Sequence, residues 1–267
     1  MRNNQSMDGL PDGAPAGLPI GVEAAAERIA AAERIVVLTG AGISTDSGIP
    51  DFRGPKGVWT RNPGAEKAAN IQNYLSDGAV RRAAWLNRLD TPVWTAEPNR
   101  GHRCIVELER RGQLHAVVTQ NIDELHQQAG TDPDKVIEVH GTVRWTRCWD
   151  CSDRRPMPET LDRVRAGEAD PPCLVCGGIL KSDTISFGQS LVPAVIDRAL
   201  RVSDECDLLL AIGSTLSVYP AANCVPVAKR AGAEVVIVNG QPTEMDRFAD
   251  HLLIGQIADV LPFLVAL

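Results

Sequence analysis

The sequence lacks three features that would place it in other classes of protein. It has no run of about 20 apolar residues, the length that a helix needs to span a bilayer. Its first residues lack the basic and apolar regions of a secretory signal peptide. It also lacks an excess of positive charge: the formal net charge of -7 disfavours nucleic acid held by bulk electrostatics. These absences predict a cytoplasmic protein that binds neither a membrane nor nucleic acid.

The N-terminal residues 1–19 differ in composition from the rest of the chain. They are rich in glycine, proline and polar residues, and they include a second methionine, Met7. This composition predicts a disordered leader, and Met7 allows a later start codon. The whole sequence is 44% hydrophobic and 23% charged, which is typical of a globular protein with a buried core. Its 267 residues suit one large domain, alone or with a smaller insert.

Short apolar runs recur along the chain and are separated by segments of helical length. Continuous runs of β-branched residues and leucine are typical of strands covered on both faces, as in a parallel sheet. The predicted strands are 35–38, 116–119, 136–139, 208–212, 235–238 and 251–254. The predicted helices are 22–32, 79–89, 193–202 and 259–264. This alternation predicts an α/β sheet domain.

Four of the seven cysteines form two C-x-x-C pairs with 21 residues between them, and they are Cys148, Cys151, Cys173 and Cys176. This spacing is typical of a structural zinc ribbon, in which two tight turns present four thiolates to one Zn²⁺. A redox pair and a disulfide framework are the alternatives. The second pair argues against redox chemistry, and a reducing compartment argues against disulfides. Four thiolates fill the coordination sphere, so the metal is expected to be structural.

Two stretches interrupt the α/β alternation. Residues 55–98 contain a helical segment but no predicted strand, and residues 145–185 contain the cysteine pairs. We therefore predict an α/β fold with a Rossmann-like parallel sheet domain, and a smaller domain formed by a helical insert and a four-cysteine zinc ribbon. The predicted division is 20–54, 99–144 and 186–267 for the sheet domain, 55–98 for the helical insert and 145–185 for the zinc ribbon.

A glycine-rich turn follows the first predicted strand. Gly40 and Gly42 would let backbone amides approach a pyrophosphate, and a following helix N-terminus would favour its charge. The usual dinucleotide fingerprint has a third glycine where this sequence has Thr45, and any tight strand-to-helix turn can use glycines. The polar loop 44–55 that follows is long, as ligand-binding loops often are. The acidic residue expected about 20 positions on is missing, which disfavours a hydride-transferring dehydrogenase.

Polar residues also end two further predicted strands. Strand 116–119 runs into Gln120-Asn121-Ile122-Asp123, and strand 136–139 runs into His140. Ligands bind beyond the carboxyl ends of strands in a doubly wound sheet, so both clusters should face one crevice. By itself His140 fits a turn residue, but beside an amide and a carboxylate it is a candidate general base. The remaining histidines are expected to be structural or to lack polar companions, and they are His102, His115, His126 and His251.

Taken together, these motifs resemble those of the sirtuins, the NAD-dependent protein-lysine deacylases. The resemblance runs from about Ile35 to the C-terminus. It rests on the four cysteines and on the segments 40–44, 48–53, 119–123, 140–141, 187–188, 213–216 and 238–239.

The resemblance implies that NAD and an acylated lysine of a protein substrate meet in a cleft between the two domains. NAD would be consumed, with nicotinamide and O-acyl-ADP-ribose as products. His140 would take a proton from a ribose hydroxyl, and Asn121 would be a second catalytic residue. The peptide would add as a strand between the segment after Phe187 and residues 217–219. The implied NAD-binding residues are Gly40, Ala41, Asp51, Phe52, Arg53, Gln120, Asn121, Ile122, Asp123, Gly213, Ser214, Thr215, Asn239, Gln241 and Ile257.

The sequence also departs from parts of the family pattern. Gln189 stands where many members carry Glu, and residues 52–59 resemble a branch with weak deacetylation, long-chain deacylation and mono-ADP-ribosylation. The Tyr-x-x-Arg pair of the desuccinylase branch is absent, because Tyr74 is followed by Asp77. We therefore expect a deacetylase or long-chain deacylase, with mono-ADP-ribosyl transfer on the same site as the alternative. A non-catalytic NAD sensor or zinc-ribbon interaction module is disfavoured because His140 and Asn121 are both present.

Overall fold

The computed structural model describes residues 17–51, 57 and 69–266 of the chain. Most of the predicted leader and two of the predicted NAD-binding residues, Phe52 and Arg53, lie outside the described residues. Within the part that is described, no helix is both long and apolar enough to cross a membrane.

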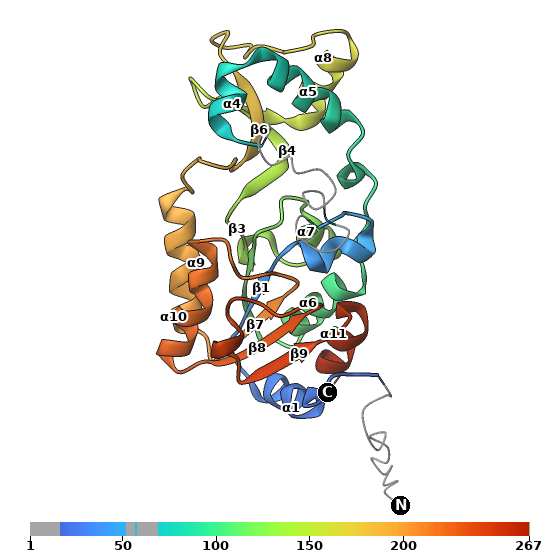
Figure 1. Ribbon diagram of the computed structural model, residues 1–267, viewed down its shortest axis with the longest axis vertical. Helices are drawn as coiled ribbons and strands as arrows, with labels where there is room; N and C mark the ends of the chain where they lie inside the picture. The colour runs from blue at the N-terminus through green and yellow to red at the C-terminus, as the bar shows by residue number, and fades with distance from the viewer. Residues whose placement is uncertain (1–16, 52–56, 58–68, 267) are drawn as a thin grey trace, which may run out of the picture.

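A six-stranded parallel sheet forms the larger part of the molecule (Figure 1). Its strands are β1 (Ile35–Thr39), β2 (Leu114–Thr119), β3 (Val136–Glu138), β7 (Leu208–Ile212), β8 (Glu234–Asn239) and β9 (His251–Ile254). Each of the six predicted runs forms one of these strands, within two residues at either end. The spatial order is β3-β2-β1-β7-β8-β9, so the order reverses between β1 and β7. Ligands bind at this kind of reversal, beyond the carboxyl ends of the strands.

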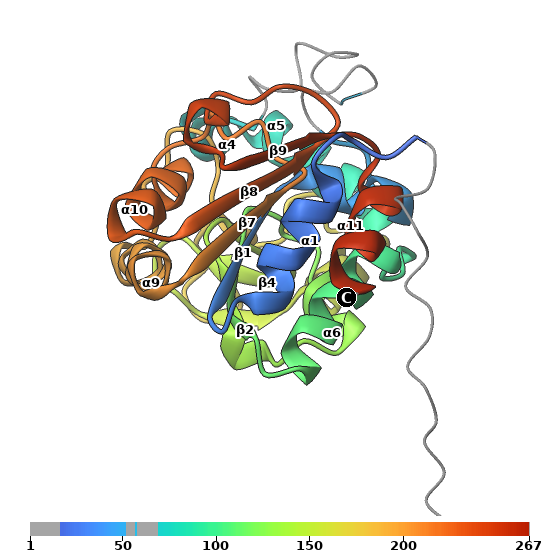
Figure 2. The same cartoon turned by 90° about the horizontal axis from the view of Figure 1, so that it is seen from below.

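Helices cover both faces of this sheet (Figure 2). The helices on one face are α1 (Val22–Ala31), α6 (Arg100–Arg110) and α11 (Ile257–Ala266), and those on the other are α9 (Pro193–Glu205) and α10 (Cys224–Ala231). Successive strand residues enter opposite cores because side chains alternate along a strand. In β1, Ile35 and Val37 join the core under α1, while Val36 and Leu38 join the core under α9. This two-sided burial explains why the strands appear as unbroken apolar runs in the sequence.

Local signals in the sequence set the beginnings of several helices. Pro193 opens α9 at its first turn, where a missing N–H costs nothing. Asn99 caps α6: its side-chain oxygen accepts hydrogen bonds from the backbone N–H groups of Gly101 and His102. In return His102 Nδ1 accepts from the backbone N–H of Asn99 at 3.3 Å. His102 is therefore fixed by a capping box and is not part of a reactive site.

A smaller domain lies at the other end of the molecule (Figure 1). Its elements are α4 (Ile71–Ser76), α5 (Gly78–Leu89), α8 (Met157–Arg165) and an antiparallel sheet of β5 (Arg154–Pro156), β4 (Gly141–Cys148) and β6 (Leu180–Thr184). The predicted helix 79–89 corresponds to α5. One apolar core joins α5 to the zinc-ribbon segment, and its buried members are Trp85, Cys148, Met157, Leu161, Val164, Cys173 and Leu180. The helical and cysteine-bearing inserts therefore pack as one body.

The remaining elements are short connections. They are α7 (Leu125–Ala129) and the 3-10 helices η1 (Ala41–Ser47), η2 (Pro92–Trp94), η3 (Pro133–Lys135), η4 (Ala221–Asn223) and η5 (Asp246–Phe248). The predicted start of the zinc-ribbon insert, residue 145, falls inside β4, which links the two domains directly after His140.

Candidate active site

A cavity of about 1340 Å³ opens between the carboxyl ends of the parallel strands and the smaller domain. Loops that follow all six strands contribute to its lining, as do α5 and β6. The predicted site residues that line it are Gly40, Ala41, Asp51, Gln120, Asn121, Ile122, Asp123, His140, Gly213, Ser214, Thr215, Asn239, Gln241 and Ile257. The fold thus brings these sequence-predicted residues, from segments far apart in the chain, to one place.

The glycines of the first loop are required by a backbone crossing. A Cβ on Gly40 would lie 2.7 Å from the carbonyl oxygen of Gly213, and a Cβ on Gly42 would lie 2.7 Å from Gly213 Cα. Gly213 has a positive φ of 64°, and its own Cβ would lie 2.5 Å from the backbone nitrogen of Ile43. The loops after β1 and β7 therefore cross so closely that these three positions leave no room for a side chain. This contact brings the two halves of the sheet edge together at the point where the strand order reverses.

The segment after this turn is a 3-10 helix, η1, and not the α-helix that a dinucleotide fingerprint predicts. Thr45 occupies the position of the missing third glycine, and its hydroxyl donates a hydrogen bond to the Gly42 carbonyl at 2.9 Å. Gly48 ends η1 with a positive φ of 84°. The tight 3-10 geometry explains why the third glycine is dispensable, since no long helix packs against β1 at Thr45.

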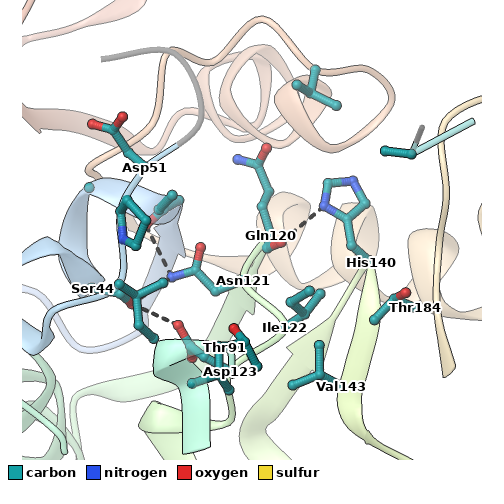
Figure 3. A pocket seen from close by; sticks show the side chains of 18 of the residues that line it. Ser44, Asp51, Thr91, Gln120, Asn121, Ile122, Asp123, His140, Val143 and Thr184 are labelled. Carbon is teal, nitrogen blue, oxygen red and sulfur yellow. Dashed lines mark hydrogen bonds between the residues drawn. The ribbon is translucent and has the colours of Figure 1, made fainter. Parts of the chain in front are cut away.

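Asn121, Ser44 and Asp123 form a hydrogen-bonded chain inside the cavity (Figure 3). Asn121 Nδ2 donates to Ser44 Oγ and to the Gly40 carbonyl, each at 3.1 Å. Ser44 Oγ in turn donates to Asp123 Oδ2 at 2.8 Å. The backbone N–H of Asn121 donates to Thr119 Oγ1 at 3.1 Å. These bonds fix the Asn121 amide with its donors on protein and its carbonyl oxygen left to accept from a ligand.

Asp123 is buried at the bottom of this chain, with 4% of its surface exposed. Burial raises the pKa of Asp123 above its ordinary value, while hydrogen bonds from the Leu125 N–H and the Ser44 hydroxyl lower it. Burial is the largest of these effects. A buried carboxyl of this kind suits the recognition of an uncharged amide, because it can accept from an N–H donor in a site that excludes water.

His140 lines the same cavity as Asn121, with Gln120 between them (Figure 3). Its Nδ1 lies 3.0 Å from the Gln120 carbonyl oxygen, which can only accept, so the neutral ring carries its proton on Nδ1. The other nitrogen, Nε2, is then the basic one. Burial lowers the pKa of His140, and the hydrogen bond to Gln120 raises it by less. The ring is therefore neutral near pH 7, which is the form that can take a proton, and the role of His140 as general base stays a prediction.

The far end of the cavity is lined by the loops after β7 and β8. Gln120 Nε2 donates to Ser214 Oγ at 2.9 Å, which joins the loop after β2 to the loop after β7. Asn239 Nδ2 donates to the Gln241 carbonyl at 2.6 Å. Ile257 opens α11 at the same edge of the cavity. These polar and apolar groups line the cavity from the loops after β7 and β8 and from the start of α11.

The other histidines have partners that the sequence did not reveal. His126 Nε2 lies 3.0 Å from Thr39 Oγ1 in the buried interior behind the site, in keeping with a structural role. The expectation that His115 and His251 lack polar companions was wrong. His115 pairs with Glu205 at 3.2 Å, and His251 pairs with Glu234 at 2.9 Å. Glu205 is 90 residues from His115, and Glu234 is 17 residues from His251 on the neighbouring strand β8.

The four predicted zinc ligands converge in the smaller domain. Their Sγ atoms all lie within 4.8 Å of one another, with Cys148 and Cys176 at 3.5 Å and Cys151 and Cys173 at 3.7 Å. Such spacings suit four sulfurs placed about 2.3 Å from one Zn²⁺. Backbone N–H groups also point at three of the sulfurs, as expected for turns that present thiolates. The donor set and its geometry therefore fit a structural zinc ion.

Some cavity residues were absent from the sequence-based site. Ser44 joins Asn121 to Asp123, and a polar residue two positions after Gly42 was the available signal. Arg88 lines the cavity from α5, and Ser182 and Thr184 line it from β6. Arg88 follows Val80 and Ala84 at helical spacing, so an arginine on the inner face of a helix could have been noticed.

The Sir2 family model matches residues 40–220 of this chain. The chain belongs to the Sir2 family. It is 48% identical over 231 residues to the NAD-dependent protein deacetylase 2 of Streptomyces coelicolor, covering 86% of this chain and 96% of that protein. A solved structure of a Sir2 enzyme is 39% identical with a TM-score of 0.82, covering 92% of this chain and 96% of that one. A Sir2–p53 peptide–NAD⁺ structure is 32% identical with a TM-score of 0.78, covering 88% and 93%.

Proposed function

We propose that this Sir2-family protein is an NAD-dependent protein-lysine deacylase. The observation that carries the proposal is a single cavity lined both by His140, whose Nδ1 contacts the Gln120 carbonyl, and by the hydrogen-bonded Asn121–Ser44–Asp123 chain. The relative from Streptomyces coelicolor, which matches almost end to end, is named an NAD-dependent protein deacetylase. When bound, NAD supplies an activated ribose that takes the acyl group from lysine and releases nicotinamide.

The roles of the glycine loops follow from their geometry. Gly40, Ala41 and Gly213 present backbone close to the ligand at the strand-order reversal, which suits the pyrophosphate of NAD. We assign the adenosine half to Ser214, Thr215, Asn239, Gln241 and Ile257, which line the cavity from the loops after β7 and β8 and from the start of α11.

We assign binding of the nicotinamide half of NAD to the loop after β2. Asp123 and Asn121 offer acceptor oxygens in a buried pocket, and the nicotinamide amide carries matching N–H donors. Ile122 adds an apolar wall. Asp51, Phe52 and Arg53 are predicted to help hold the pyrophosphate and ribose, and Phe52 and Arg53 lie outside the described residues.

His140 acts as the general base. Its Nδ1 proton is held by the Gln120 carbonyl, so Nε2 is available to accept a proton from a ribose hydroxyl. Asn121 acts beside it by ordering the ribose and the leaving amide, since its own orientation is fixed by Ser44 and Gly40.

The acyl-lysine peptide binds as an added strand between two segments at the mouth of the cavity. One contains Phe187 and Gln189, and the other contains Val218 and Tyr219; Phe187 and Tyr219 expose 37% and 54% of their surface. Backbone pairing of this kind gives affinity with little dependence on the peptide sequence. A zinc ion held by the four cysteines would keep the two turns of the ribbon folded and has no part in the chemistry.

Deacylation and mono-ADP-ribosyl transfer can be separated in one experiment. The protein is incubated with NAD and either acetyl-lysine or myristoyl-lysine peptide, and nicotinamide and O-acyl-ADP-ribose are quantified by mass spectrometry. We expect both products in equal amounts, and no deacylation by His140→Ala although it still binds NAD. If no acyl peptide releases nicotinamide, the deacylase assignment fails. Label transferred from NAD to protein, without O-acyl-ADP-ribose, would favour the transferase.

We also propose a cytoplasmic location. The proposed domain division is a sheet domain of residues 20–54, 99–144 and 186–267, a helical insert of residues 55–98 and a zinc-ribbon insert of residues 145–185.

A further inference from the structure

Two buried histidines lie close together in the interior behind the cavity. His102, on α6, and His126, on α7, each expose at most 1% of their surface. Their ring centres are 5.0 Å apart, with 62° between the ring planes. Burial lowers the pKa of His102 to about 4 and the pKa of His126 to about 3. Both rings are therefore neutral near pH 7, and each carries its proton on one of its two nitrogens.

The proton of His126 lies on Nε2. The Thr39 hydroxyl donates its only hydrogen to Thr119 Oγ1 at 2.8 Å. Thr39 Oγ1 also lies 3.0 Å from His126 Nε2, so in that contact the hydroxyl has to accept. A neutral imidazole donates only from its protonated nitrogen. Nε2 of His126 is therefore the donor, and Nδ1 is left as a buried acceptor.

His102 carries its proton on the nitrogen that complements this acceptor. Its Nδ1 accepts from the backbone N–H of Asn99 at 3.3 Å, so Nε2 holds the proton. Within the described residues, His102 Nε2 and His126 Nδ1 are both buried without a hydrogen-bond partner. One is a donor, the other is an acceptor, and the rings that carry them are adjacent. Buried polar groups pair either directly or through a buried water, and these two nitrogens are complementary for either arrangement.

Hydrogen bonds connect the two rings to the loops that line the cavity. At one end, Thr119 Oγ1 accepts from the backbone N–H of Asn121 at 3.1 Å. At the other end, the Asn99 side chain donates to the Ile43 carbonyl at 2.7 Å and to Ser47 Oγ at 3.0 Å, and both acceptors belong to η1. The histidine relay is the series of five residues Asn99, His102, His126, Thr39 and Thr119. It joins the loop after β1 to the backbone of Asn121.

We propose that His126 is a positioning residue for Asn121 and acts on it through the hydroxyls of the histidine relay. The inference rests on the proposed deacylase function, in which Asn121 orders the ribose and the leaving amide. The direction of the hydrogen bonds depends on one proton. With that proton on Nδ1 instead, His126 would accept from Thr39, and Thr39 could no longer donate to Thr119. The donor at His102 Nε2 favours the tautomer of His126 that keeps the series intact.

The first test removes the donor of His126 and then restores it. His126→Leu has no donor, whereas the side-chain amide of His126→Gln can donate from a similar position. With saturating NAD and an acetyl-lysine peptide, we expect kcat to fall about tenfold in His126→Leu, the size expected when a catalytic group is held slightly out of place. His126→Gln should recover to within about threefold of the wild type. KM for the peptide should stay within about twofold in both variants, because the peptide binds at the mouth of the cavity. A wild-type kcat in His126→Leu, or equal losses in the two variants, would refute the positioning role.

The second test breaks the histidine relay at Thr39, and it replaces the first if His126→Leu does not fold. Thr39→Val keeps the shape of the side chain and removes the hydroxyl, so kcat should again fall about tenfold. Thr160→Val is the matched control, because Thr160 and Thr146 form another buried pair of hydroxyls, with their oxygens 3.1 Å apart, in the smaller domain. This control should keep the wild-type kcat. Equal losses of kcat in Thr39→Val and Thr160→Val would contradict the proposal.

Combining two changes tests whether the residues act in series. His126→Leu and Thr39→Val interrupt the same hydrogen bonds, so the double variant should lose about tenfold in kcat, as each single variant does. Independent effects would multiply to a loss of about a hundredfold, and that result would show that the two residues do not form one relay.

Nuclear magnetic resonance tests the proton positions without any activity. In isotope-labelled wild-type protein, long-range proton–nitrogen correlation spectra distinguish the two neutral forms of each imidazole. We expect the proton on Nε2 in both His102 and His126. A proton on Nδ1 of His126 would overturn the relay.

The activity of the wild type separates the two possible failures. If the wild type deacylates the acetyl-lysine peptide and the relay variants keep its kcat, the positioning role fails and the deacylase function stands. If the wild type releases no nicotinamide, the deacylase function itself fails, and the positioning role fails with it even where both protons lie on Nε2.

Discussion

Replacing Gly213 by alanine tests whether the glycine crossing builds the NAD site. The residue has a φ of 64°, and a left-handed conformation costs an alanine about 1–2 kcal/mol. The new methyl group would also lie 2.5 Å from Ile43 N and 2.8 Å from Gly42 C, which are backbone atoms that cannot turn aside. Overpacking of this kind adds about 1–3 kcal/mol. We therefore expect Gly213→Ala to lower the free energy of unfolding by about 2–5 kcal/mol.

The same change should weaken NAD binding, because the first loop must move away from the loop after β7. Gly232→Ala is the matched control: φ is 94°, and nothing lies within 4 Å of the added Cβ. It should lose only the conformational part, about 1–2 kcal/mol, and bind NAD normally. Urea denaturation measures the stability of both variants, and isothermal titration calorimetry measures their NAD affinity. We expect a loss of affinity of about tenfold or more for Gly213→Ala alone, the loss of one hydrogen bond to a charged group. Equal losses of stability in the two variants, with NAD affinity retained in both, would refute the reasoning.

Three further predictions follow from the site and the cysteine cluster. His140 should set the acid limb of the pH profile of kcat/KM: the neutral ring is the active base, burial lowers its pKa below the ordinary value of 6.5, and activity should be lost only as the pH falls through that lower value. A limb centred above pH 6.5 would contradict this. Ser44→Ala should cost about 1–3 kcal/mol in urea denaturation, because it removes the donor to buried Asp123 and the acceptor of Asn121. Ser76→Ala, which loses one exposed hydrogen bond to Gln72, should cost under about 0.5 kcal/mol, and similar losses in the two would contradict the role of Ser44. Cys173→Ser should lose the zinc, as measured by inductively coupled plasma mass spectrometry, and with it the near-ultraviolet circular dichroism of the smaller domain, whereas Cys104→Ser should keep both. Full zinc content in Cys173→Ser would show that the metal is held elsewhere.

The parallel sheet could be predicted from the sequence because its strands are buried on both faces. Burial of every side chain of β1 forces an unbroken apolar run, and such a run is visible without any neighbour. The antiparallel sheet of the smaller domain gave no such signal. Its strand β6 contains Lys181, Ser182 and Asp183, and these polar residues are satisfied by hydrogen bonds and ion pairs from other segments.

The site was predicted as a set of residues but not as a set of interactions. Motifs around Gly40, Asn121 and His140 marked the loops, because the turn geometry and the chemistry of each loop are local. Ser44 and Asp123 are 79 residues apart, so nothing in either segment reveals that one donates to the other. The proton position on His140 likewise depends on the carbonyl of Gln120, in a different loop.

The sequence by itself determined the α/β sheet domain, the Sir2 family motifs and the four cysteines of the ribbon, because each depends on short-range patterning and on fixed spacing. Only the tertiary structure decided which groups meet across the cavity. The histidine relay behind Asn121 exists because His126 on α7 contacts Thr39 on β1, 87 residues away in the sequence. Hydrogen bonds between distant segments carry no periodic signal, so they could be found only once the chain was folded.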